Sequence, residues 1–251
     1  MDINQVKDRY RKYIESFDLT ESNIKRKYIH SFRVMQIATD IAEFSKFNES
    51  DKEIVTIAAL LHDYGRFHQW ENYKTYEDRD SIDHADKAIE FLYGDGEIIN
   101  YTLKVVDYDE IHDAIKYHSK YEIPEGLSEH NKKILEVVRD ADKLDIFYIY
   151  ASGEKLIKED DSDITKEVID QYNNEKCIRF TKDNTNNDLI VGIIAMVFDL
   201  NYYYSFKLLK EKNYIDKMFE SIKDKEKFRP YFEGVKKYID KKLSEETENV
   251  R

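Results

Sequence analysis

His62 and Asp63 place an imidazole nitrogen and a carboxylate oxygen side by side at the end of an apolar run. Residues 54–61 are apolar except for Thr56, which predicts a buried helix at the centre of the fold. Ending such a helix in two polar groups costs free energy unless both find partners, and a divalent metal ion would satisfy both. A capping aspartate beside a surface histidine explains the pair about as well, so the dipeptide alone does not establish a metal site.

His30 and Asp142 strengthen the case for a metal. Each lies in a segment of helical periodicity, next to residues that are expected to face the core. A single histidine on an apolar face is usually a core residue with a satisfied hydrogen bond, but four such groups on three predicted helices are harder to explain in that way. Imidazole and carboxylate are the ligands that iron, manganese and zinc prefer where cysteine is absent. The set therefore indicates a metal centre.

These residues and their surroundings resemble the HD-domain superfamily of metal-dependent phosphohydrolases. The resemblance covers about residues 25–150 and rests on HSFRV around His30, ALLHDYGRF around His62 and Asp63, and DADKLD around Asp142. It implies an all-α helical bundle in which these four residues are the core metal ligands. The combined pattern is specific for the superfamily, but it does not specify the substrate.

Two more histidines, His84 and His118, occupy the places where dinuclear members of the superfamily carry a third and a fourth histidine. The resemblance therefore implies six ligands, which could hold two metal ions. The alternative is a single metal ion, with His84 and His118 as proton donors or substrate contacts. We expect one or two divalent ions, manganese or iron first, with zinc, nickel, cobalt and magnesium as further possibilities. His68, His112 and His130 are expected to lie elsewhere.

Arg66 follows the His–Asp pair where related proteins often carry a lysine or an arginine. A guanidinium there could bind a phosphate through two parallel hydrogen bonds. The alternative is an ordinary surface arginine after a helix cap. The predicted catalytic residues are accordingly Asp63, His84, His118 and Arg66.

The resemblance implies hydrolysis of a nucleotide or another small phosphate ester by metal-activated water. A first alternative is a di-iron oxygenase, because some relatives use the same six ligands to activate oxygen. A second alternative is a regulatory protein that binds a nucleotide without turnover, which the complete ligand set disfavours. The ligand set does not separate phosphohydrolysis from oxygen activation, because surrounding groups and the redox state of the metal decide between them.

The residues of the predicted centre lie on or beside a series of predicted helices. Gly65 is expected to cap the C-terminus of the helix that ends at the His–Asp pair. The polar segment that follows, 66–81, has no clear period and is predicted to be an ordered loop. The predicted helices of this region comprise residues 21–46, 51–63, 83–93, 107–117 and 128–150.

Beyond Gly153 the character of the sequence changes. Residues 154–187 are polar and are predicted to form a mobile insertion with one short helix. Residues 188–212 and 214–243 are predicted to be helical again, with a break at Pro230. We therefore expect one all-α HD-type domain over residues 1–251, with a metal-binding core at about 21–150 and a C-terminal helical extension at about 151–251.

The composition agrees with an all-α protein and limits its partners. Two prolines and seven glycines in 251 residues favour long helices over a many-stranded fold. The formal net charge of -12 disfavours binding to duplex nucleic acid, which needs lysine and arginine to neutralise phosphates. A metal site can still bind a small anionic substrate, because the ion inverts the local field. A single cysteine excludes a disulfide framework.

The sequence predicts a cytoplasmic protein without membrane association. Its N-terminal residues lack the apolar stretch of a signal peptide, and the longest apolar run, 189–198, is too short to span a membrane. A homo-oligomer is compatible with this reading.

Overall fold

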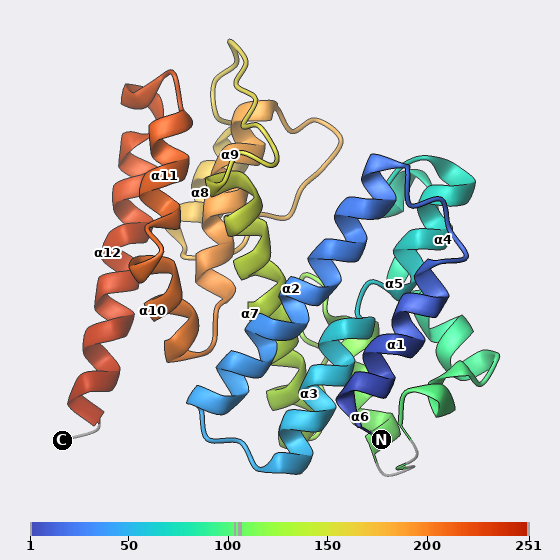
Figure 1. Cartoon of the computed structure of the whole chain (residues 1–251). Helices are drawn as coiled ribbons and strands as arrows, with labels where there is room; N and C mark the ends of the chain where they lie inside the picture. The colour runs from blue at the N-terminus through green and yellow to red at the C-terminus, as the bar shows by residue number, and fades with distance from the viewer. Residues whose placement is uncertain (1, 103, 105–106, 250–251) are drawn as a thin grey trace. The chain divides into compact units, whose positions relative to one another are not determined.

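The computed structural model describes residues 2–102, 104 and 107–249, and every regular element within them is a helix (Figure 1). This confirms the predicted all-α fold class. The chain divides into two compact units, Met1–Asp142 and Lys143–Arg251, with the boundary inside helix α7 (Glu129–Ala151). The boundary falls near the expected junction between core and extension, and the assignment of one HD-type domain to the whole chain stays a prediction.

The first unit is built from helices and short helical turns that precede or include the N-terminal part of α7. Its helices are α1 (Ile3–Ile14), α2 (Ser22–Phe44), α3 (Glu49–Leu61), α4 (Tyr64–Tyr73), α5 (His84–Ile89) and α6 (Tyr108–Tyr117). Its short turns are η1 (Asp78–Asp80), η2 (Glu90–Gly94) and η3 (Glu97–Asn100).

Helix α3 lies at the centre of this unit. Its N-terminus is capped by Asn48, whose side chain accepts a hydrogen bond from the Asp51 backbone N–H at 2.9 Å. Every side chain of residues 54–61 is buried, and α3 packs against α1, α2 and α6. The chain therefore delivers His62 and Asp63, which follow α3 directly, to the interior.

The segment after Asp63 differs from the prediction. Helix α4 begins at Tyr64 and runs to Tyr73, where a loop was expected from residue 66. Gly65 lies in the first turn of α4, so its predicted role as a C-terminal cap is wrong. A Cβ at Gly65 would meet the His84 carbonyl oxygen at 2.2 Å and the Ala88 backbone nitrogen at 2.9 Å. This glycine lets α4 pack directly against the backbone of α5.

Helix α1 was not predicted, but the remaining helices of the unit confirm the predictions closely. Helices α2, α3, α6 and α7 begin and end within two residues of the predicted bounds. The predicted helix 83–93 is α5 followed by the π-type turn η2. Periodic apolar faces located α2, α6 and α7 well, because each buries one face in the core, and the continuous apolar run located α3.

The second unit contains the C-terminal part of α7 and a further series of helices around an apolar core. Val168, Val191, Met218, Phe228 and Val235 are completely buried in it. The helices are α8 (Lys166–Asn173), α9 (Asn186–Ala195), the 3-10 turn η5 (Met196–Asp199), α10 (Tyr203–Glu211), α11 (Tyr214–Ser221) and α12 (Lys225–Asn249).

Two boundaries in the second unit differ from the prediction, whereas the expected short helix in the polar segment is α8. The predicted helix 188–212 is divided into α9, η5 and α10. The predicted break at Pro230 is wrong, because Pro230 lies inside α12 and the chain breaks at residues 222–224 instead. Pro230 is the sixth residue of α12, so its missing N–H removes one hydrogen bond of the helix, and yet the helix continues through it.

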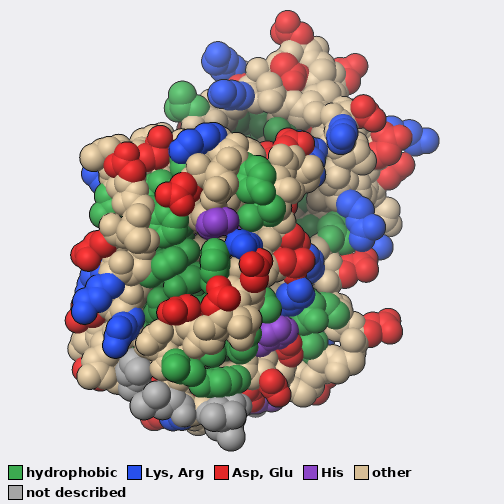
Figure 2. Space-filling model, turned by 90° about the vertical axis from the view of Figure 1, so that its right-hand side faces the viewer, with side chains coloured by type: hydrophobic (Ala, Val, Ile, Leu, Met, Phe, Trp, Pro, Cys, Tyr) green, Lys and Arg blue, Asp and Glu red, His purple; other side chains and the backbone are tan. Residues whose placement is uncertain are grey.

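The surface is strongly charged. On the face drawn in Figure 2, lysine and arginine side chains are scattered among acidic ones and exposed apolar groups. Within the residues that the structure describes, no helix is long and apolar enough to cross a membrane.

Candidate metal centre

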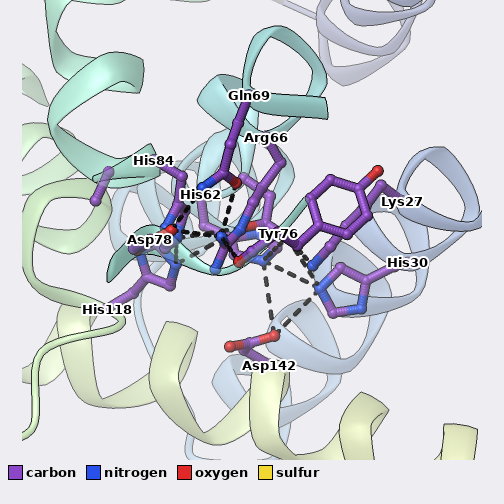
Figure 3. A network of polar contacts seen from close by, with 12 residues as sticks. Lys27, His30, His62, Arg66, Gln69, Tyr76, Asp78, His84, His118 and Asp142 are labelled. Carbon is purple, nitrogen blue, oxygen red and sulfur yellow. Dashed lines mark hydrogen bonds and ion pairs between the residues drawn. The ribbon is translucent and has the colours of Figure 1, made fainter. Parts of the chain in front are cut away.

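The structure brings all six predicted ligands together within the first unit (Figure 3). They come from five helices and the junction between α3 and α4. Five of the six are buried almost completely, and the Asp142 side chain is 22% exposed. The six predicted ligands are His30 on α2, His62 at the end of α3, Asp63 before α4, His84 at the start of α5, His118 at the end of α6, and Asp142 on α7.

Asp63 lies between two pairs of histidines. Its Oδ2 is 3.4 Å from both His30 Nε2 and His62 Nε2. Its Oδ1 is 3.5 Å from His84 Nε2 and 3.9 Å from His118 Nε2. A carboxylate whose two oxygens face different histidine pairs has the arrangement needed to bridge two metal ions.

Asp142 joins the first of these pairs. Its Oδ1 is 3.2 Å from His30 Nε2 and 3.7 Å from His62 Nε2. The centre therefore has two halves. By the ion-pair distances the first half consists of His30, His62, Asp142 and Asp63 Oδ2, and the second half consists of His84, His118 and Asp63 Oδ1. His62, His118 and Asp142 form a further group that connects the two halves.

The hydrogen bonds of the histidines show which ring nitrogens are free to bind a metal. His62 Nδ1 lies 2.7 Å from the Ala59 carbonyl oxygen, and His118 Nδ1 lies 2.8 Å from the Ile115 carbonyl oxygen. A carbonyl oxygen only accepts, so each Nδ1 carries the proton. In the neutral ring Nε2 then has a free lone pair, and both Nε2 atoms face the centre.

His84 has the same tautomer for a different reason. Its Nδ1 lies 2.6 Å from Asp78 Oδ2. An ionised carboxylate oxygen only accepts, so Nδ1 carries the proton and donates this hydrogen bond. Its Nε2 faces His118 Nε2 at 3.1 Å. Two neutral imidazoles that point lone pairs at each other at this distance repel, unless a cation lies beside both.

Burial favours the neutral form of the His84 and His118 rings, and the Asp63 carboxylate stays charged. Burial lowers the pKa of His84, and the neighbouring charge of Arg66 lowers this pKa further. Burial also lowers the pKa of His118 well below its ordinary value. Burial alone would raise the pKa of Asp63, but the positive charge of Lys27 holds this pKa well below its usual range. Neutral imidazoles around ionised carboxylates are the donor set that a divalent cation requires, so the residues fit a metal.

Lys27 is a member of the site that the sequence prediction missed. Its Nζ donates to Asp63 Oδ2 at 2.6 Å, and its side chain is 21% exposed. It also lies over the Tyr76 ring, 5.5 Å from the ring centroid. A signal was present, because Lys27 precedes His30 by three residues and therefore shares its face of α2.

Arg66 lies inside the site rather than on the surface, with its side chain 15% exposed. Its Nε is 3.4 Å from Asp63 Oδ1. Its Nη1 donates to Asp78 Oδ1 at 2.6 Å, to Gln69 Oε1 at 2.8 Å and to the Tyr76 carbonyl oxygen at 2.6 Å. Contact between Arg66 and a phosphate stays a prediction.

The remaining histidines lie elsewhere, as expected. His112 contacts Asp113, and His130 contacts Asp51. His68 packs edge-on against Phe91.

The helices and the histidine–aspartate centre define an all-α protein with a candidate site for divalent metal. Residues 28–147 match the family model of the HD domain, and this stretch contains every one of the six clustered residues. Residues 28–147 therefore form an HD domain, which places this part of the chain in the HD-domain superfamily. Comparison with curated proteins and with solved structures found no match.

Proposed function

We propose that this chain is a metal-dependent phosphohydrolase that acts on a nucleotide or another small phosphate ester. The observation that carries the proposal is the position of Asp63, with one oxygen directed at each histidine pair. In this proposal His30, His62, Asp63 and Asp142 hold one ion, and Asp63, His84 and His118 hold a second. When bound, divalent metal would lower the pKa of water and neutralise charge on a phosphoryl group.

The chain's own cations give the site its preference for an anion. The protein carries a formal net charge of -12, yet Lys27 and Arg66 both lie against Asp63. Lys27 at 21% and Arg66 at 15% side-chain exposure are more accessible than Asp63 at 3%. We therefore assign Lys27 and Arg66 to the side from which a phosphate approaches. Their charges would hold nonbridging oxygens in place during the reaction.

Which group donates a proton to the leaving oxygen depends on whether His84 and His118 bind metal. The alternative in which His84 or His118 donates it requires one of these rings to be free of metal. In that case the alanine variant of that histidine would lose activity but keep its bound metal. Measuring both quantities on each alanine variant separates the two roles.

Product analysis tests the proposal directly. Manganese-loaded protein is incubated with a panel of nucleotides and phosphate esters, and the products are separated by chromatography. Asp63→Ala is run beside it as the inactive variant, and His112→Ala serves as the matched histidine control outside the site. Cleavage by wild type and His112→Ala, but not by Asp63→Ala, is the expected result.

Other outcomes point to the alternatives. No cleavage across the panel, together with oxygen consumption by iron-loaded protein, would support a di-iron oxygenase. Tight nucleotide binding without turnover in the presence of metal would support a regulatory protein. Either result would contradict the proposed phosphohydrolase activity.

A further inference from the structure

Asp78 lies outside the six ligands but contacts one of them. Its Oδ2 is 2.6 Å from His84 Nδ1, on the side of the ring opposite the metal-facing Nε2. His62 and His118 direct the same ring nitrogen to backbone carbonyl oxygens instead. His84 therefore has an ionised partner where these two histidines have neutral ones.

The position of Asp78 is itself determined by buried groups. Its Oδ1 accepts from Arg66 Nη1 at 2.6 Å and from Gln69 Nε2 at 2.9 Å. Gln69 is completely buried, and its Nε2 also lies 2.8 Å from Ser81 Oγ and 3.0 Å from the Ile82 carbonyl oxygen. Both carboxylate oxygens of Asp78 thus have fixed partners, which orients the carboxylate toward the His84 ring (Figure 3).

A carboxylate in this position changes what the imidazole can do. It holds the proton on Nδ1, keeps the lone pair of Nε2 directed at the centre, and makes that nitrogen a stronger donor. The effect is local, because only one of the two halves contains His84. The sequence does not single out Asp78, which lies among several acidic residues of a polar segment.

We infer that Asp78 is a positioning residue that selectively strengthens metal binding in the second half of the centre, formed by Asp63 Oδ1, His84 and His118. This inference rests on the proposed metal centre. Loss of Asp78 should lower the affinity of the second half for metal by about 10- to 100-fold. The affinity of the half formed by His30, His62 and Asp142 should not change.

The geometry predicts an unusual order of severity for two variants. In Asp78→Asn the side-chain carbonyl must face Arg66 and Gln69, because both of them donate. The amide NH₂ then faces His84 Nδ1 and forces the proton onto Nε2, which removes the metal-binding lone pair. Asp78→Ala only removes the hydrogen-bond partner of His84 Nδ1, so the ring can still carry its proton on either nitrogen. Asp78→Asn should therefore damage the second half more than Asp78→Ala does.

The first test reads the tautomer in metal-free protein, without any activity measurement. NMR spectra of ¹⁵N-histidine-labelled protein report which nitrogen of each ring carries the proton. His84 should be protonated at Nδ1 in wild type, mixed in Asp78→Ala and protonated at Nε2 in Asp78→Asn, with His62 unchanged throughout. The matched control is Asp80→Asn, which removes the same charge from an exposed neighbour. An unchanged His84 tautomer in both Asp78 variants would overturn the inference.

The second test titrates metal-free protein with Mn²⁺ alone and measures bound metal and affinity. Wild type and Asp80→Asn should bind two equivalents, and Asp78→Asn should bind one equivalent with wild-type affinity. Two equivalents at wild-type affinity in Asp78→Asn would overturn the role of Asp78 and leave the proposed function intact. Fewer than two equivalents in wild type would overturn the two-metal centre, and this inference with it.

Discussion

At the scale of single residues, Asp63 differs from the other ligands because it belongs to both halves of the centre. Its two oxygens face separate histidine pairs, whereas the ion pairs of Asp142 among the described residues are with His30 and His62. Removing Asp63 therefore takes a donor from both halves, and removing Asp142 takes one from the first half alone. The two carboxylates should be distinguishable by counting metal.

We expect Asp63→Ala to lose metal from both halves and Asp142→Asn to lose it from one half. Both variants should lose most activity, because each weakens the proposed centre. Elemental analysis of protein reconstituted with manganese measures the remaining equivalents, and circular dichroism checks that the helices persist. Full metal in Asp63→Ala would show that the carboxylate at the centre of the cluster is not a ligand.

Lys27 and Arg66 offer a second contrast at this scale. Replacing Lys27 by methionine should raise the KM for an anionic substrate by about 10- to 100-fold, the cost of about 1.5–3 kcal/mol for a lost charged hydrogen bond. Metal content should change little, because Lys27 is not one of the six clustered residues that would hold metal. Arg66→Ala should raise KM and also lower the affinity of the second half for metal, since Arg66 donates a hydrogen bond to Asp78. Steady-state kinetics and metal analysis on both variants measure the difference, and equal effects on metal content would contradict it.

At the scale of elements, the packing of α4 on α5 sets the position of His84. Gly65 permits this packing, because a Cβ there would lie 2.2 Å from the His84 carbonyl oxygen. We expect Gly65→Ala to lower the free energy of unfolding by about 1–3 kcal/mol and to reduce metal binding in the second half. Thermal denaturation and metal titration measure both effects. Gly94→Ala is the matched control, since a Cβ there meets nothing within 4 Å.

The N-terminus of α9 provides a prediction for the second unit. Asp188 is completely buried, and it accepts from the backbone N–H of Thr165 at 2.8 Å and of Thr185 at 3.0 Å. Asp188→Ala leaves these donors unpaired and should lower the free energy of unfolding by about 1–3 kcal/mol. Metal content should stay at the wild-type level, because the clustered ligands all belong to the first unit. Chemical denaturation measures the stability, with the exposed Asp183→Ala as control.

At the scale of the whole molecule, metal binding and folding are coupled. The ligands come from five helices and one junction of the first unit, so the centre does not exist in the unfolded chain. A ligand that binds only the native state stabilises it by about 2.7 kcal/mol at a free concentration of 100 Kd. Chelation should therefore lower the melting temperature of wild type in calorimetry. Asp63→Ala should melt at the same temperature with and without chelator, and an unchanged wild type would contradict the coupling.

The errors of sequence-based reasoning have a common physical origin. The bounds of the helices with one periodic apolar face were predicted within two residues. The apolar pattern of such a helix can be recognised without knowing which element packs against it. Helix α4 was missed because its sequence shows no clear period, and Gly65 was read as a cap although its purpose is contact with α5. Pro230 was read as a break, yet α12 continues through it, and the buried side chains of Phe228 and Phe232 hold the helix in the core on both sides of the proline.

The sequence by itself determined the all-α class, the superfamily and the six candidate ligands. The all-α class follows from composition and apolar periodicity, whereas the superfamily and the complete set of six ligands are implied by the resemblance of local motifs. All of these are local properties of the chain. Only the tertiary structure decided that Asp63 divides the ligands into two halves, that Lys27 lies on Asp63, and that Asp78 supports His84. The physical reason is that contacts such as Lys27–Asp63 join residues far apart in the chain. The direction of each side chain there depends on how the helices pack.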